Sequence, residues 1–168
     1  MTMDAPVAGR ALVVIVDDRS AHGDPGGTAT GKLVTELLSE GGFIVDGALI
    51  VSSDEVEIRN ALNTAVIGGV DLVISVGGTG VGARDVTPEA TADVLDRQIA
   101  GVEEAIRSSG LSAGAMDAGL SRGLVGTSGS TLVVNLASSR AAIRDGMATL
   151  IPLAKHLIEE LSDLEIDD

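Results

Sequence analysis

The sequence contains no cysteine, tryptophan or tyrosine, and Phe43 is its single aromatic residue. Without cysteine the chain has no disulfide, no thiolate nucleophile and no cysteine-ligated metal. A single aromatic side chain also excludes the stacking platforms on which single-stranded nucleic acids bind. The core must therefore be built from Val, Leu, Ile and Ala.

Basic residues are scarce as well. Lys and Arg number 11 against 25 Asp and Glu, which gives a formal charge of −14. Such a charge repels nucleic acid and acidic lipid, so we expect neither as a partner. A phosphate ligand must then be held locally, by loop amides, a few Arg or Lys side chains and a metal ion. The two histidines, His22 and His156, lie far apart in the sequence and receive no role.

Long apolar runs are also missing. The sequence has no stretch of about 18 apolar residues and no signal-peptide core, so we expect no membrane segment and predict a cytoplasmic protein. With 168 residues, of which 45% are hydrophobic, the chain is long enough for one domain with a substantial core. We therefore predict a single domain over residues 1–168, in which residues 1–9 form a flexible arm.

Strand and helix patterns alternate along the chain, and short apolar runs without polar interruptions are typical of buried parallel strands. They predict an α/β domain of three layers around a mostly parallel sheet. A hairpin around residues 128–130 makes this sheet mixed. The expected strands cover residues 11–16, 43–51, 70–76, 124–127 and 131–136, and the expected helices cover residues 31–40, 54–67, 87–95, 101–107, 141–150 and 152–161.

Three local signals refine this pattern. Asp46 and Gly47 interrupt the second strand and predict a bulge at a sheet edge. Ser52 and Glu55 form a capping box for the helix that follows. Pro152 either kinks the last helix or starts a new one.

The stretch from Val70 to Thr91 is the most informative in the chain. Its apolar strand ends at Val76 and is followed by a run of glycines, at positions 77, 78 and 80. Glycines tolerate positive φ and let a ligand approach the main chain, so the N–H groups of such a loop can surround an anion. Open α/β sheets bind ligands at this carboxyl edge of their strands. The alternative is a turn that closes the sheet without any ligand.

Charged residues stand on both sides of this predicted edge. Arg84 can clamp a phosphate and Asp85 can hold a divalent cation. Both precede a helix that we expect to begin with Thr87 as N-cap and Pro88 at its first position. Residues 17–19, two aspartates and an arginine, follow the first strand. They either contact the same ligand or form a solvated turn.

The string GGTG followed by RDVTPEAT resembles the signature of the molybdopterin adenylyltransferase family, the group of MogA, MoaB and the gephyrin G domain. The resemblance covers residues 11–161. It implies a Rossmann-like molybdopterin-binding domain of molybdenum cofactor biosynthesis that transfers an adenylyl group from Mg-ATP to molybdopterin and releases pyrophosphate. It also implies a homo-oligomer, either a trimer or a hexamer.

The resemblance assigns roles to individual residues. Asp85 and Asp54 would hold Mg²⁺ and serve catalysis, and Asp54 has the alternative of merely complementing a helix dipole. Asn135 would bind substrate or only cap a turn. The residues that the resemblance places at substrate and phosphate are Gly77, Gly78, Thr79, Gly80, Arg84, Asp18, Ser130, Asn135, Ser138 and Ser139.

Three positions depart from the family pattern. Thr28 stands where the family has an acid, Ser53 stands where it has a catalytic acid next to Asp54, and Ala137 replaces part of a Pro-Gly loop. These changes keep a second hypothesis open, a non-catalytic molybdopterin binder or protein-interaction module. A generic Rossmann nucleotide binder is less favoured, because GxGxxG and a Walker lysine are both absent. Residues 112–120 are expected to form a lid, a subunit interface or a local core.

Overall fold

A six-stranded sheet with the strand order β2-β1-β3-β6-β5-β4 runs through the computed structural model, which describes residues 7–167. Strands β2, β1, β3 and β6 are parallel, whereas β5 and β4 each pair antiparallel with their neighbour. This confirms the mostly parallel, mixed sheet. The strands are β1 (Gly9–Val16), β2 (Phe43–Val51), β3 (Leu72–Val76), β4 (Arg97–Gln98), β5 (Val125–Ser128) and β6 (Thr131–Leu136).

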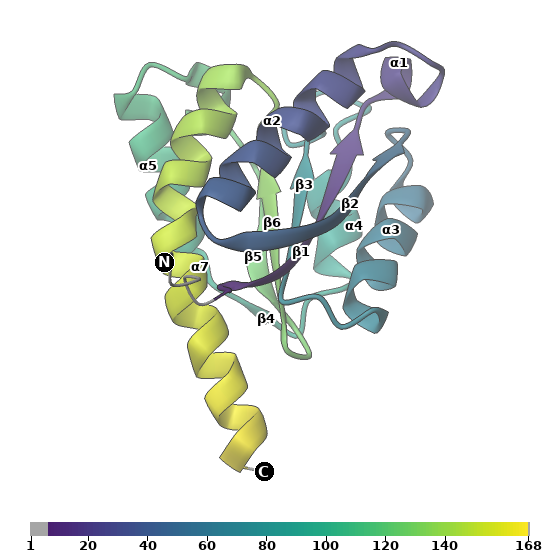
Figure 1. Ribbon diagram of the computed structural model, residues 1–168. Coiled ribbons are helices and arrows are strands. Elements are labelled where there is room, and N and C mark those ends of the chain that lie inside the picture. Colours follow the sequence, from purple (N-terminus) through teal and green to yellow (C-terminus); the bar gives the residue numbers. More distant parts are fainter. Residues whose placement is uncertain (1–6, 168) are drawn as a thin grey trace, which may run out of the picture.

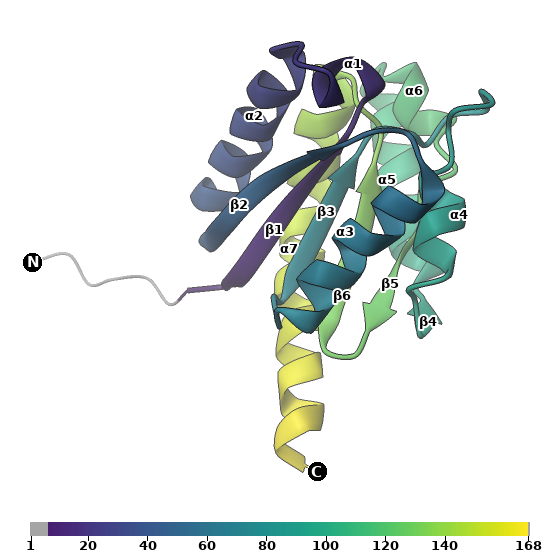
Figure 2. The same ribbon diagram turned by 90° about the vertical axis from the view of Figure 1, so that its right-hand side faces the viewer.

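Helices cover both faces of the sheet and give the three layers that the sequence predicts (Figures 1 and 2). Helices α2, α5 and α7 lie on one face, and α3 and α4 lie on the other. The helices are α1 (Asp18–Ala21), α2 (Gly26–Glu40), α3 (Glu55–Ile67), α4 (Thr87–Ala92), α5 (Ala100–Ser112), α6 (Met116–Gly119) and α7 (Arg140–Asp167). In the part of the chain that the structure describes, no helix is both long and apolar enough to span a bilayer.

The core divides into two clusters because successive side chains of a strand point to opposite faces. In β3, Leu72, Ile74 and Val76 pack with α2, α5 and α7, whereas Val73 packs with α3 and α4. All five residues of β3 are buried, as expected for a central strand. The apolar run that the sequence shows is therefore the middle of the sheet.

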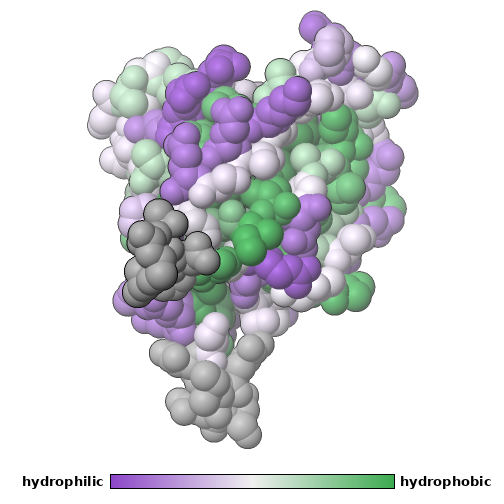
Figure 3. Space-filling view, viewed as in Figure 1, coloured by the Kyte–Doolittle hydropathy of each residue, from purple (hydrophilic) through white to green (hydrophobic). Residues whose placement is uncertain are grey.

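The second strand forms the edge of the sheet and carries the predicted bulge. Its register with β1 jumps from Ala11–Val45 to Leu12–Gly47, which leaves Asp46 as an extra residue. The Asp46 carboxylate pairs with the guanidinium of Arg10 on β1. Apolar surface gathers along this edge (Figure 3), where Ile44, Leu49 and Ile50 are exposed.

Several boundaries differ from those predicted, each for a local reason. α2 begins at Gly26 rather than at Gly31. Its first turn packs against α1, where a Cβ at Gly27 would lie 2.5 Å from the Cβ of Ser20, so this turn needs glycine at that position. The capping box is wrong, since Asp54, not Ser52, is the N-cap of α3.

At the two ends of the chain the structure also differs from the prediction. α7 is one continuous helix through Pro152, whose missing N–H belongs to a solvent-exposed position of the helix. The ring therefore does not end the helix. Residues 1–6 of the expected arm lie outside the described residues, and Gly9 already belongs to β1.

Candidate functional site

The candidate site lies where the strand order changes direction. β2 lies on one side of β1 and β3 lies on the other, so the carboxyl ends of β1 and β3 border the crevice in which open α/β sheets bind ligands. Gly77 leaves β3 against the end of β1. A Cβ at Gly77 would lie 2.4 Å from the carbonyl oxygen of Val16, so only glycine fits this approach.

The glycine loop folds back onto the start of α4. Gly78 has a φ of +70°, and the hydroxyl of Thr87 donates to the carbonyl oxygen of Gly77 at 2.9 Å. The N–H of Gly77 donates to Leu136 at 2.9 Å, so it is not available to an anion. The N–H groups of Gly78, Thr79 and Gly80 have no partner among the described residues. The expected anion cradle is thus reduced to these three amides.

Two cavities meet at this loop. The first has a volume of about 450 Å³ and is bordered by the glycine loop and by apolar side chains that include Val81 and Leu120. The second has a volume of about 400 Å³ and a polar lining that includes Asp17, Asp18 and Arg19. Both are lined by Gly77, Gly78, Asp85 and Ser138.

Asp85 forms part of the wall that the cavities share. Its Oδ2 accepts a hydrogen bond from the N–H of Gly82 at 2.9 Å, and its own N–H donates to the carbonyl of Gly82 at 3.0 Å. A Cβ at Gly80 would lie 2.8 Å from Oδ2, so the loop closes tightly around this carboxylate. Oδ1 accepts no hydrogen bond from the described residues. One carboxylate oxygen is therefore free to face a ligand.

Asp18 and Arg84 form a pair between two of the loops. Nε of Arg84 donates to Oδ2 of Asp18 at 3.0 Å and Nη2 donates to Oδ1 at 2.7 Å, while the N–H of Ser53 donates to Oδ1 at 2.8 Å. These bonds, those from Arg84 above all, lower the pKa of Asp18 to about 2. Arg84, expected to clamp a phosphate, is engaged by a carboxylate instead.

A pH dependence follows from this pair. The pKa of Asp18 in the folded protein lies below its ordinary value of 3.8, so its stabilising effect is full above pH 4 and disappears as the pH falls towards 2. We expect Asp18→Asn to lower the melting temperature at pH 7, and the difference from wild type to shrink between pH 4 and pH 2. Calorimetry across this range measures it. A difference that is independent of pH would contradict the prediction.

Asp54 serves as a helix cap in this structure. Its Oδ2 accepts a hydrogen bond from the N–H of Glu57 at 3.0 Å, and its side chain lines neither cavity. Over residues 7–167, no group of three or more acidic or histidine side chains could hold a metal by itself. The expected role of Asp54 as a second magnesium ligand stays a prediction.

The start of α7 reaches the same crevice. Ser138 lines both cavities, and its anion-binding role stays a prediction. Ser139 is engaged as the cap of α7, where its Oγ accepts the N–H of Ala142 at 3.1 Å. The same hydroxyl donates to Asp117 at 2.7 Å, and the Ser139 N–H donates to Asp117 at 3.1 Å. The anion at this position is therefore a side chain of the protein, which sequence reasoning did not identify.

Two of the expected substrate residues lie elsewhere. Ser130 sits in the β5–β6 turn, and because Leu132 pairs with Leu72 at the start of β3, this turn is at the opposite end of the sheet from Gly77 (Figure 2). Asn135 is buried within β6. Neither residue lines the cavities.

The Asn135 side chain forms hydrogen bonds with groups inside the protein. Its amide nitrogen donates to Ser75 at 2.8 Å and to Thr91 at 3.0 Å, and its oxygen accepts from the N–H of Leu124 at 3.0 Å. This network joins β3, α4 and the chain before β5. A residue chosen for a ligand thus turns out to hold the sheet to α4.

We expect Asn135→Ala to lower the free energy of unfolding by about 2–4 kcal/mol, because it removes three hydrogen bonds, two of them buried and one partly buried. Phosphate affinity should change by less than about threefold, since the side chain lies outside the cavities. Urea unfolding and isothermal titration measure the two quantities. Thr64→Ala, which removes a single exposed hydrogen bond within α3, is the control.

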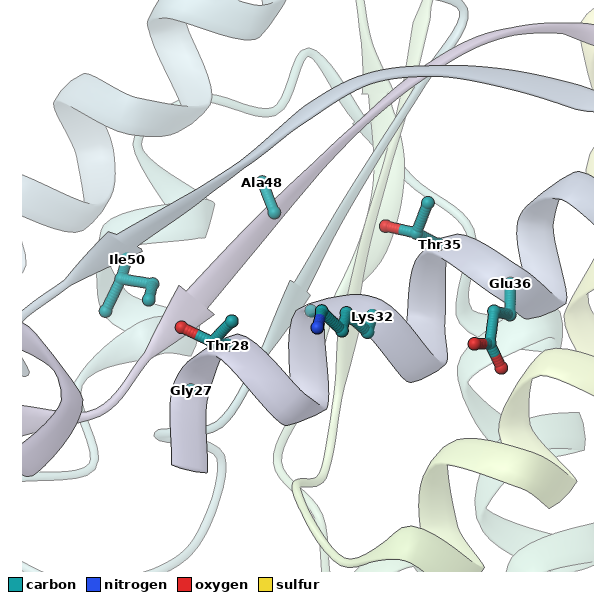
Figure 4. Close-up of a pocket in the computed structure, with 8 residues that line it drawn as sticks. Gly27, Thr28, Lys32, Thr35, Glu36, Ala48 and Ile50 are labelled. Carbon is teal, nitrogen blue, oxygen red and sulfur yellow. The ribbon is translucent and has the colours of Figure 1, made fainter. Parts of the chain in front are cut away.

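Thr28, one of the departures from the family pattern, borders a different hollow. A groove of about 320 Å³ lies between α2 and β2, with Thr28, Lys32 and Ile50 around it (Figure 4). It shares no lining residue with the two cavities. Thr28 itself therefore lines neither of the two cavities.

Comparison with known proteins agrees with this architecture. A family model described as a probable molybdopterin binding domain matches residues 12–156. Molybdenum cofactor biosynthesis protein B of Bacillus cereus is 38% identical over 157 residues, which cover 89% of this chain and 88% of that protein. A crystal structure of a molybdopterin biosynthesis protein from Mycobacterium abscessus is 66% identical with a TM-score of 0.91, covering 94% of this chain and 99% of that one.

The likeness extends to a more distant structure. The tungsten cofactor synthesizing protein MoaB from Pyrococcus furiosus is 26% identical with a TM-score of 0.82, covering 93% of this chain and 98% of that one. Its sheet and helices are thus retained at low identity. The chain belongs to the molybdopterin-binding domain family of MoaB and MogA, the proteins of molybdenum cofactor biosynthesis.

Proposed function

We propose that this protein adenylylates molybdopterin with Mg-ATP, giving adenylyl-molybdopterin and pyrophosphate. The observation that carries this proposal is the meeting of two cavities at one glycine loop and one carboxylate. A reaction between two substrates needs their reacting groups in contact. Gly78 and Asp85 belong to both cavity walls, which is where such groups would meet.

The two cavities suit different substrates. Val81 and Leu120 border the first and are 88% and 70% exposed, so they offer apolar contact to a flat pterin, while the free amides of Gly78, Thr79 and Gly80 suit its phosphate. The second cavity, with its polar lining, would receive ATP. An oxygen of the molybdopterin phosphate attacks the α-phosphorus, a new P–O–P bond forms, and pyrophosphate leaves with the electrons of the broken bond. No protein nucleophile is required.

The residues also fit a magnesium ion. Mg²⁺ is usually held by one or two carboxylates together with substrate phosphates, and Oδ1 of Asp85 is free for this purpose. When bound, the ion offsets the negative charge of the phosphates. Arg84 would add to this charge if phosphate displaces Asp18 from it.

An assay of pyrophosphate release tests the proposal. Purified protein with Mg-ATP should release pyrophosphate only when molybdopterin is added, and mass spectrometry should find adenylyl-molybdopterin in equal amount. Tight binding of molybdopterin without any pyrophosphate would contradict it.

A specific observation favours a second candidate, a non-catalytic molybdopterin binder or protein-interaction module. Asp54 is engaged in capping α3, and Arg84 is engaged by Asp18, so two groups expected to act on phosphate have other partners. In that case the protein binds molybdopterin but ATP changes neither its affinity nor the product. The same assay separates the two functions.

We further propose a homotrimer, or a hexamer built from it, in the cytoplasm. Leu111 and Met116 near the α5–α6 junction are 54% and 63% exposed, which leaves an apolar surface for a neighbouring copy. Light scattering at micromolar concentration should give a mass of about three or six chains of 16.9 kDa. A mass of one or two chains would contradict the proposal.

A further inference from the structure

We propose that Arg122 is a positioning residue for this reaction. It holds both ends of the loop from Gly80 to Asp85, and thereby holds Asp85 in place at the wall that the two cavities share. The expected effect on turnover rests on the proposed adenylyl transfer. The claim that Arg122 holds the loop rests only on the hydrogen bonds of Arg122.

Arg122 grips the two ends of this loop through main-chain oxygens. Its Nε donates to the carbonyl of Gly80 at 2.8 Å, and Nη2 donates to the carbonyl of Asp85 at 2.7 Å. The N–H of Arg122 donates to the carbonyl of Thr79 at 2.8 Å as well. A segment some 40 residues further along the chain, before β5, therefore closes the loop.

The remaining donors of the guanidinium face Glu89 in the first turn of α4. Nη1 donates to Oε2 of Glu89 at 2.8 Å and Nη2 donates to Oε1 at 3.1 Å. The pKa of Glu89 is lowered, mainly by these hydrogen bonds. Four of the five N–H donors of an arginine are thus engaged within the protein. Arg122 is therefore placed to hold the loop rather than to bind a phosphate itself.

The loop has little other support. Val81 is 88% exposed. Between the two ends of the loop, the only side-chain hydrogen bonds to the described residues are those of the Gly82–Asp85 turn and of the Arg84–Asp18 pair. The preceding residues are held differently, since Gly77 bonds to Leu136 and Gly78 bonds to Thr87. Loss of Arg122 should therefore free Asp85 while leaving Gly77 and Gly78 in place.

This separation gives a kinetic signature. Arg122→Ala should lower kcat for pyrophosphate release about 30-fold, because Asp85 no longer holds its position. KM for molybdopterin should rise by no more than about fivefold, because Gly80 and Val81 loosen whereas Gly78 keeps its bond to Thr87. Arg122→Lys should recover only part of kcat, because one ammonium cannot bridge two carbonyls and a carboxylate in the fork geometry of arginine. Glu89→Gln should have an intermediate effect.

Hydrogen exchange supplies a readout that does not depend on turnover. The N–H groups of Gly82 and Asp85 are bonded within the loop and should exchange at least tenfold faster in Arg122→Ala. Arg59→Ala is the matched control, since Arg59 pairs with Asp93 at 3.2 Å, also next to α4, and forms no hydrogen bond with the loop in the described part of the chain. It should change neither the exchange of the loop nor kcat by more than about twofold.

The outcomes separate this inference from the proposed function. A kcat of Arg122→Ala within twofold of wild type, an equal loss in Arg59→Ala, or unchanged loop exchange would overturn it. If wild-type protein releases no pyrophosphate, the proposed function fails, and loop exchange alone then decides: faster exchange in Arg122→Ala supports the loop-holding role, and unchanged exchange refutes it.

Discussion

Asp85→Asn is expected to lower the turnover of pyrophosphate release by roughly a hundredfold or more. Asp85 lines both cavities, and the negative charge of its carboxylate is what would hold Mg²⁺ against the phosphates. A group of this kind contributes on the order of 3 kcal/mol to transition-state stabilisation, and about 1.4 kcal/mol corresponds to a tenfold change in rate. The loop itself should survive, because the asparagine oxygen can still accept the hydrogen bond from Gly82.

Steady-state kinetics of both proteins, together with molybdopterin titrations, measures this effect. Asp93→Asn is the control, since it removes the same charge from an exposed carboxylate that pairs with Arg59 and lines neither cavity. Turnover like that of wild type in Asp85→Asn would refute the assigned role. If neither protein turns over while both bind molybdopterin equally, the non-catalytic function becomes the better description.

Gly78→Ala is expected to weaken phosphate binding by at least tenfold and to destabilise the fold. A φ of +70° costs a non-glycine residue about 1–3 kcal/mol. In addition, the new Cβ would lie 2.2 Å from Oγ1 of Thr87, so Thr87 must move and give up its hydrogen bond to Gly77. The free amides at 78–80 would then shift away from the anion.

Gly69→Ala is the control that separates the two effects of a Cβ at Gly78, which are backbone strain and displacement of Thr87. Gly69 has a similar φ of +74°, but a Cβ there meets nothing within 4 Å. This variant should lose comparable backbone stability and keep its phosphate affinity. Titration with inorganic pyrophosphate and urea unfolding compare the two. Equal phosphate affinity in both variants and wild type would show that the glycine loop is not an anion cradle.

The sequence was sufficient for those parts of the site that come from one continuous segment. The strand ending at Val76, the glycines after it and Asp85 all lie where the pattern predicts, because local φ preferences and burial are written into neighbouring residues. The edge bulge at Asp46 is equally local. Each of these features depends on residues close together in the chain.

The partners of side chains could not be predicted in the same way. Arg122 and Asp117 bond to loops far away in sequence, and nothing in their own neighbourhood indicates which carbonyl or hydroxyl they will meet. Asn135 shows the converse error. An amide that ends a strand pattern suits a ligand as well as a buried network, and only the packing of α4 against β6 decides for the network.

The bulge at Asp46 divides the outer edge of β2 into two parts, which differ in how readily another strand can pair with them. Bulges and charges at a sheet edge oppose pairing with a further chain, and here the extra residue is itself a carboxylate paired with Arg10. A regular partner strand can follow only the part from Gly47 to Val51, where Leu49 and Ile50 are exposed. Two copies of this chain can therefore share a short patch along this edge, while growth of a continuous intermolecular sheet, the route to fibrils, is blocked at Asp46.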